Sequence, residues 1–64
     1  MLDERLIGEK FINKSTEMSG TVMFYGVRYH YKLQENVPIG TTLVVVAVTP
    51  RYLLVQRYEP KLDY

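Results

Sequence analysis

The sequence contains no cysteine, no tryptophan and a single histidine, His30. Without cysteine the chain has no disulfide, no thiol nucleophile and no thiolate site for zinc or an iron–sulfur cluster. One histidine also falls short of the three or four nitrogen or sulfur ligands that most zinc sites use. We therefore expect no metal and no cofactor, and a 64-residue domain that depends on its apolar core for stability.

The net charge is small, and long hydrophobic runs are scarce. Eight Lys and Arg against seven Asp and Glu leave a formal net charge of +1, whereas dedicated nucleic-acid-binding domains are usually strongly basic. No apolar run approaches the roughly 18 residues that a membrane-spanning helix requires. Nucleic acid is therefore not the expected partner, and any contact with a membrane is expected only through parent segments absent from this chain.

Motifs that carry chemistry are few. Serine occurs only at Ser15 and Ser19, and neither lies in the strand–turn–helix context of a serine nucleophile. The triplet Asn13-Lys14-Ser15 matches the N-glycosylation sequon, a short pattern that often arises by chance and matters only in a secreted protein. We expect no catalytic residues and a chain that is not an enzyme.

The stretch from Gly20 to Leu33 predicts a β-hairpin with a two-residue turn at Tyr25-Gly26. Gly26 supplies the positive φ that such turns require, whereas Tyr25 is an unusual residue for the other position. In this register the apolar side chains share one face: Val22, Phe24, Val27, Tyr29, Tyr31 and Leu33. The other face carries Thr21, Met23, Arg28, His30 and Lys32.

Three further runs are predicted to be strands: Gly8 to Lys14, Thr41 to Thr49 and Tyr52 to Tyr58. Pro38 and Gly40 interrupt the link 34–40, which leaves no room for a stable helix. Five short strands separated by turn residues predict an all-β barrel or sandwich. We expect one domain over 1–64, with its core at about 6–59, a short lead-in and a loose tail. Its fold is a five-stranded Greek-key barrel of the OB type, with an SH3-like barrel as the alternative.

Alternation within the strands also predicts the core. The side chains expected to be buried lie on the apolar side of their strands: Val22, Tyr29, Val45 and Val55. Tyr31 is expected in the core or at its edge, and Tyr52 and Tyr58 are expected to be partly exposed on the last strand.

Glycines and apolar residues follow one another in a distinctive order: Leu6-Ile7-Gly8, Ser19-Gly20-Thr21-Val22, Gly26-Val27-Arg28-Tyr29, Pro38-Ile39-Gly40-Thr41, then Leu43, Val45, Val46, Val48, Leu53 and Val55. This set resembles the C-terminal soluble domain of NfeD-like proteins. It departs from that family at Phe11, Tyr31 and Pro50, where glycine or a small residue is frequent. The resemblance implies a small OB-fold barrel that lacks the usual helix between strands 3 and 4.

The resemblance also implies a function. The domain would be a soluble interaction module on the cytoplasmic side of a membrane-anchored parent protein, in contact with stomatin-like membrane proteins. The family pattern places Leu43, Val45, Val46 and Val48 inward, with a bulge that lets two neighbours share that side. The outward residues Val44 and Ala47, beside Leu54, would then meet a partner, a second copy or the parent's membrane-proximal segment. The alternative is that the chain's own ends cover them.

The third predicted strand also carries a stripe of polar side chains. Period-two spacing puts Arg28, His30 and Lys32 on one face of the third strand, in the region where OB folds commonly bind ligands. The alternative function is therefore binding of single-stranded nucleic acid or oligosaccharide through this face. Such sites add exposed aromatic rings for stacking, but Tyr29 and Tyr31 alternate with the charges and point inward. We therefore favour a solvated or protein-contacting face.

Overall fold

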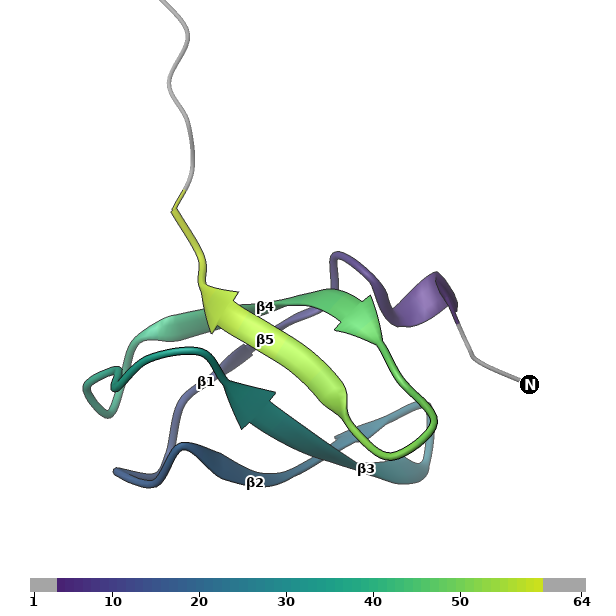
Figure 1. The fold of residues 1–64 in the computed structure, drawn as a ribbon, viewed down its shortest axis with the longest axis horizontal. Coiled ribbons are helices and arrows are strands. Elements are labelled where there is room, and N and C mark those ends of the chain that lie inside the picture. Colours follow the sequence, from purple (N-terminus) through teal and green to yellow (C-terminus); the bar gives the residue numbers. More distant parts are fainter. Residues whose placement is uncertain (1–3, 60–64) are drawn as a thin grey trace, which may run out of the picture.

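A single strongly curled sheet of five strands forms the fold (Figure 1). The computed structural model describes residues 4–59. A 3-10 turn, η1 (Glu4–Leu6), precedes the strands β1 (Lys10–Ile12), β2 (Ser19–Phe24), β3 (Val27–Leu33), β4 (Thr42–Val48) and β5 (Leu53–Arg57). The sheet makes a half-barrel consistent with a small OB-like barrel, so the predicted all-β class is confirmed. The predicted tail at 61–64 lies outside the described residues.

The strands follow the order β1-β4-β5-β3-β2. β3 and β5 run parallel, and the other neighbouring pairs are antiparallel. Figure 1 shows β5 in front, with β4 and β3 on either side of it. β1 and β2 are therefore the two edges of the sheet, and the parallel contact joins the hairpin to the remaining strands.

The first strand is shorter than predicted. It covers Lys10–Ile12, whereas the sequence pattern predicted Gly8 to Lys14. Gly8 has a φ of +95°, which is outside the β region. At the other end, Asn13 is bonded to the link between β3 and β4 and not to β4 itself. Its backbone N–H donates to the carbonyl oxygen of Thr41 at 2.8 Å. The last two strands are likewise trimmed by a residue at each end.

The predicted hairpin is confirmed in its register. Phe24 lies opposite Val27, and Val22 lies opposite Tyr29. Tyr25 and Gly26 have φ of 54° and 78°, the two positive values that define a type I′ turn. Tyr25 is the one non-glycine residue in the described chain with a positive φ.

The core lies on the concave side of the sheet. Its buried apolar residues are Leu6, Tyr31, Leu33, Val37, Leu43, Val45, Leu53 and Val55. Val45 and Val55 lie opposite one another and are buried as predicted, but Val22 and Tyr29 are only half-buried. They pack against the core from β2 and from the start of β3. The prediction of burial is wrong for Val22 because β2 is an edge strand with no further strand beyond it. It is wrong for Tyr29 because β5 pairs with β3 only from Tyr31 to Leu33 and does not reach the start of that strand.

The predicted irregularity in β4 is also present. Val45 pairs with Val55, but the next pair along is Ala47 with Leu54. Val46 is therefore the extra residue of a β-bulge. The shift restores Val48 to a position opposite the buried Leu53, which explains how six consecutive apolar residues fit a strand with one buried side.

Asn13 is the one fully buried polar side chain of the described residues. Its Nδ2 donates to the carbonyl oxygen of Val37 at 2.9 Å and to that of Pro38 at 3.3 Å. Its Oδ1 accepts from the backbone N–H of Ser15 at 3.4 Å. These bonds fasten the end of β1 to the link between β3 and β4.

Gly20 lies opposite Tyr31 and leaves space for its ring. A Cβ at position 20 would stand 2.9 Å from the Tyr31 hydroxyl oxygen and 3.0 Å from Cζ. The ring has little freedom to retreat, because Tyr31 is buried and its ring centroid lies 5.1 Å from that of Phe11. A side chain at position 20 therefore overpacks this side of the core.

We expect Gly20→Ala to lower the free energy of unfolding by about 1–3 kcal/mol, the usual range for overpacking. Urea denaturation followed by circular dichroism measures the loss. Thr21→Ala, a change at the neighbouring exposed position, is the control and is expected to have little effect. Tyr31→Leu should cost less stability in the Gly20→Ala background than in the wild type, because it removes the ring that the new Cβ meets. Equal stability of Gly20→Ala and the wild type would contradict the close contact.

Candidate functional surface

The two sites predicted from sequence lie on one surface of the sheet. Leu54 of β5 pairs with Ala47 of β4 on one side and with Lys32 of β3 on the other. Adjacent strands are about 4.8 Å apart, so the three side chains form one short row. We call the convex surface of β3, β4 and β5 the outer face. The apolar candidates and the polar stripe are thus continuous, a relation that the sequence pattern did not predict.

Val44, Ala47 and Leu54 are each half-buried on this face. Val44 lies between Lys10 of β1 and Gln56 of β5. The three residues lie outward, as predicted, and their neighbours on the sheet shield them in part. Because the chain's ends, 1–3 and 60–64, lie outside the described residues, the alternative that these ends cover the patch stays a prediction.

Tyrosines stand at both ends of β5. Tyr52 directly precedes the strand, and the Lys32 Nζ lies 4.8 Å from its ring centroid. Tyr58 directly follows the strand, and the Lys10 Nζ lies 4.8 Å from its ring centroid. Such cation–π contacts hold an ammonium group over an aromatic face. Both tyrosines are partly exposed, as predicted.

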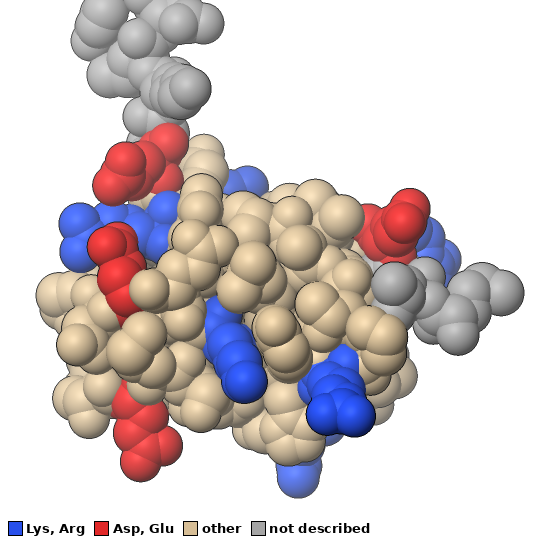
Figure 2. All heavy atoms as spheres, viewed as in Figure 1, with Lys and Arg blue, Asp and Glu red and all other residues tan. Residues whose placement is uncertain are grey.

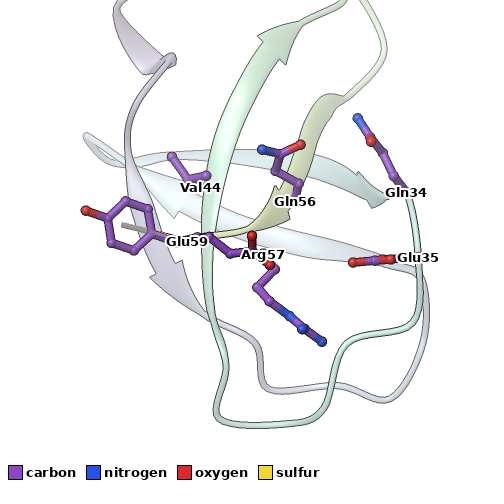
Figure 3. Close-up of a pocket in the computed structure, with 7 residues that line it drawn as sticks. Gln34, Glu35, Val44, Gln56, Arg57 and Glu59 are labelled. Atoms are coloured by element: carbon purple, nitrogen blue, oxygen red, sulfur yellow. The ribbon is translucent and has the colours of Figure 1, made fainter. Parts of the chain in front are cut away.

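A hollow of about 550 Å³ opens at the Tyr58 end of the outer face. Figure 3 shows Val44 on one side and Gln34 with Glu35 on the other, with Gln56 and Arg57 between them. Its lining residues are Gln34, Glu35, Val44, Gln56, Arg57, Tyr58 and Glu59. Acidic and basic groups are mixed there, so its charge favours no ligand of one sign.

A second hollow, of about 470 Å³, opens at the Tyr52 end. It is lined by Glu17, Ser19, Gly20, Thr21, His30, Tyr31, Lys32, Arg51 and Tyr52. Two cationic side chains and an imidazole face a single carboxylate in this set. We call it the basic hollow.

A rigid turn places Arg51 and Tyr52 at the rim of the basic hollow. The backbone N–H of Thr49 donates to the Tyr52 carbonyl at 2.9 Å, and the Tyr52 N–H donates to the Thr49 Oγ1 at 3.0 Å. The Thr49 hydroxyl donates in turn to the same carbonyl at 2.7 Å. Pro50 restricts the backbone between them. The position of Arg51 and Tyr52 therefore follows from local bonds.

The structure divides the predicted polar stripe. His30 and Lys32 line the basic hollow, whereas Arg28 lies opposite Met23, near the hairpin turn, and lines neither hollow. Sequence reasoning missed Arg51, and it did not place Tyr52 beside the polar stripe. The expectation considered only Tyr29 and Tyr31 as rings for the stripe, whereas the parallel pairing of β3 with β5 brings Tyr52 beside Lys32. Alternation 52-54-56 in the last strand was the available signal.

Neither the geometry of this surface nor comparison with known proteins assigns the chain to a family. Within residues 4–59, no three His, Asp or Glu side chains gather closely enough to hold a metal ion. No helix in the same range has the length and apolar content to cross a membrane. The chain matches no protein-family model and no curated protein.

Proposed function

We propose that this chain is a non-enzymatic interaction domain that binds another protein through its outer face. The observation that carries the proposal is the row Ala47–Leu54–Lys32, which joins an apolar centre to a basic margin across three strands. The resemblance to NfeD-like proteins extends the proposal. It makes the parent a membrane-anchored protein, puts the domain on the cytoplasmic side and makes a stomatin-like membrane protein the partner.

The composition of the outer face supports this proposal. The cores of protein interfaces are poor in charged residues and rich in aromatic ones. Here an apolar centre lies between Tyr52 and Tyr58, and each ring is covered by a lysine. Figure 2 shows mostly uncharged surface at the centre of the view, with basic side chains over β3 and near the end of β5, and acidic ones toward the margin. Arg57, the last residue of β5, is exposed. A partner would thus meet an apolar strip with a basic border.

A second candidate function is binding of single-stranded nucleic acid or oligosaccharide at the polar stripe. The observation that favours it is Tyr52, an aromatic ring beside His30 and Lys32 at the same hollow. Stacking of a base would require an open ring face, however, and the Lys32 ammonium lies over this ring. The protein-binding proposal therefore has the stronger support.

The test compares two substitutions that each introduce a carboxylate opposite a cation. Leu54→Glu puts a carboxylate opposite Lys32, and Met23→Glu puts one opposite Arg28. Each new carboxylate has a cation across from it, so both variants are expected to remain folded. Calorimetric titration with the soluble region of a stomatin-like protein measures the affinity. We expect Leu54→Glu to weaken binding about tenfold or more, a loss of about 1.4 kcal/mol, and Met23→Glu to leave it unchanged.

Two results would count against the proposal. Wild-type affinity in a folded Leu54→Glu variant would remove the outer face as the binding surface. A wild-type chain that does not bind the stomatin-like protein would remove that partner. Circular dichroism of both variants shows whether they are folded.

A further inference from the structure

We infer that the basic hollow is the site where a protein partner places an acidic side chain, next to apolar side chains that contact Leu54 and Ala47. The inference rests on the proposed function and specifies the chemistry of the partner: an extended segment that carries apolar and acidic residues. Nothing in the resemblance assigns a role to this hollow, which depends on Arg51 and Tyr52 as well as on the third strand.

The basic hollow lies next to the apolar centre of the outer face. Lys32 lines the basic hollow and lies opposite Leu54, which lies opposite Ala47. Two strand spacings of about 4.8 Å separate the ends of this row. An extended chain advances about 3.3 Å per residue, so a segment of about four residues crosses from the apolar centre to the hollow.

The lining of the basic hollow carries more positive than negative charge. Lys32 and Arg51 are cationic, and His30 adds a ring N–H donor, whereas Glu17 is the single carboxylate in the lining. Ser19 and Thr21, which carry hydroxyl groups, also line the hollow. A carboxylate accepts hydrogen bonds from each of these groups, and those from Lys and Arg are charge-assisted and strong. The lining thus suits an anionic group.

Contacts within the chain hold several side chains of the basic hollow in place before a partner binds. The Thr49 hydroxyl fixes the turn that carries Arg51 and Tyr52. The Tyr52 ring in turn holds the Lys32 ammonium at 4.8 Å from its centroid. Binding therefore orders fewer side chains than it would at an unstructured basic surface, and this reduces the entropy lost on association.

The same contacts favour a carboxylate on a peptide over a nucleic-acid strand. Lys32 lies over the Tyr52 ring, and Tyr31, the other aromatic residue of the lining, is buried. Arg28 lies outside the hollow, so the track of cations is short. A strand of nucleic acid needs a basic groove along several phosphates together with open stacking rings. A single acidic side chain needs neither.

The experiment titrates the ¹⁵N-labelled chain with three probes: a short peptide of alternating leucine and glutamate, the same peptide with glutamine for glutamate, and an oligothymidylate. We expect the Leu–Glu peptide to shift the amide signals of His30, Lys32, Arg51 and Leu54. We expect the Leu–Gln peptide to shift Leu54 and to bind about tenfold more weakly, as loss of a charge-assisted hydrogen bond predicts.

Variants of equal net charge locate the site. Lys32→Gln/Arg51→Gln removes two cations of the basic hollow. Arg5→Gln/Lys14→Gln removes two exposed cations that line neither hollow. We expect the first variant to bind the Leu–Glu peptide about tenfold more weakly or worse and the second to bind it as the wild type does.

Several results would overturn the inference: no binding of the Leu–Glu peptide, equal affinity for both peptides, or equal losses in the two double variants. Tighter binding of the oligothymidylate would establish the nucleic-acid reading in its place. Binding of both peptides at Leu54 with equal affinity would leave the proposed apolar docking intact and remove only the acidic site. A failure of the outer face itself would instead abolish the shift at Leu54 with either peptide.

Discussion

The Leu43→Ala variant is expected to lose about 2–5 kcal/mol of unfolding free energy, the usual loss for removing a buried leucine side chain. Leu43 is 0% exposed and lies opposite Phe11 of β1 and Arg57 of β5. At about 0.05–0.15 kcal/mol per residue, a domain of this size has a total stability of roughly 3–10 kcal/mol. The substitution therefore removes a large part of it, and thermal and urea denaturation followed by circular dichroism measure the loss.

Leu54→Ala is the matched control for this prediction. It makes the same chemical change on β5, but Leu54 is half-buried on the outer face. We expect it to lower stability by about 1 kcal/mol, since a half-exposed side chain removes less apolar area from water on folding. If the loss in Leu43→Ala were no larger than in Leu54→Ala, the assignment of the inward side of β4 would be wrong.

Asn13→Asp is expected to destabilise the domain by about 3 kcal/mol or more, because it creates a buried carboxylate without a cationic partner. The amide Nδ2 donates to the Val37 and Pro38 carbonyl oxygens. An aspartate oxygen in its place repels both of them and leaves them without a donor. Chemical denaturation at several pH values measures the loss.

The pH dependence identifies the cause. Burial raises the pKa of a carboxyl group in the folded state, so the folded variant binds its proton more tightly than the unfolded chain does. The stability of Asn13→Asp should therefore fall as the pH rises through the acidic range and recover on acidification. Asn36→Asp, the same change at an exposed position of the neighbouring link, should show little loss. A loss in Asn13→Asp that is independent of pH would contradict the predicted repulsion.

The features that were predicted correctly from sequence depend on residues that are close together in the chain. The hairpin depends on Gly26 and on alternation over residues that are neighbours in the chain, so one register satisfied both strands. The bulge in β4 follows from six consecutive apolar residues that must share one buried side. Alternation identifies the face on which a side chain lies, but not how much of that face the rest of the sheet covers. That limit explains why Val22 and Tyr29 were wrongly predicted to be buried.

The candidate functional surface depends on a contact that no local pattern encodes. Strand order is set by packing between distant segments, and here β3 and β5 meet in parallel through only three residue pairs. That contact brings Tyr52 beside Lys32 and Leu54 beside the same lysine. The individual candidates Val44, Ala47, Leu54, His30 and Lys32 were identifiable from sequence. Their union into one surface, with Arg51 and Tyr52 at its end, was not.

The burial of Asn13 bears on the sequon Asn13-Lys14-Ser15. An N-linked sugar is a bulky surface group that is attached through the side-chain amide nitrogen of asparagine. In the folded domain that nitrogen points inward and is bonded to two carbonyl oxygens, and the side chain has no exposed area. A glycan at Asn13 and this fold therefore exclude one another, and the motif provides no acceptor on the folded surface.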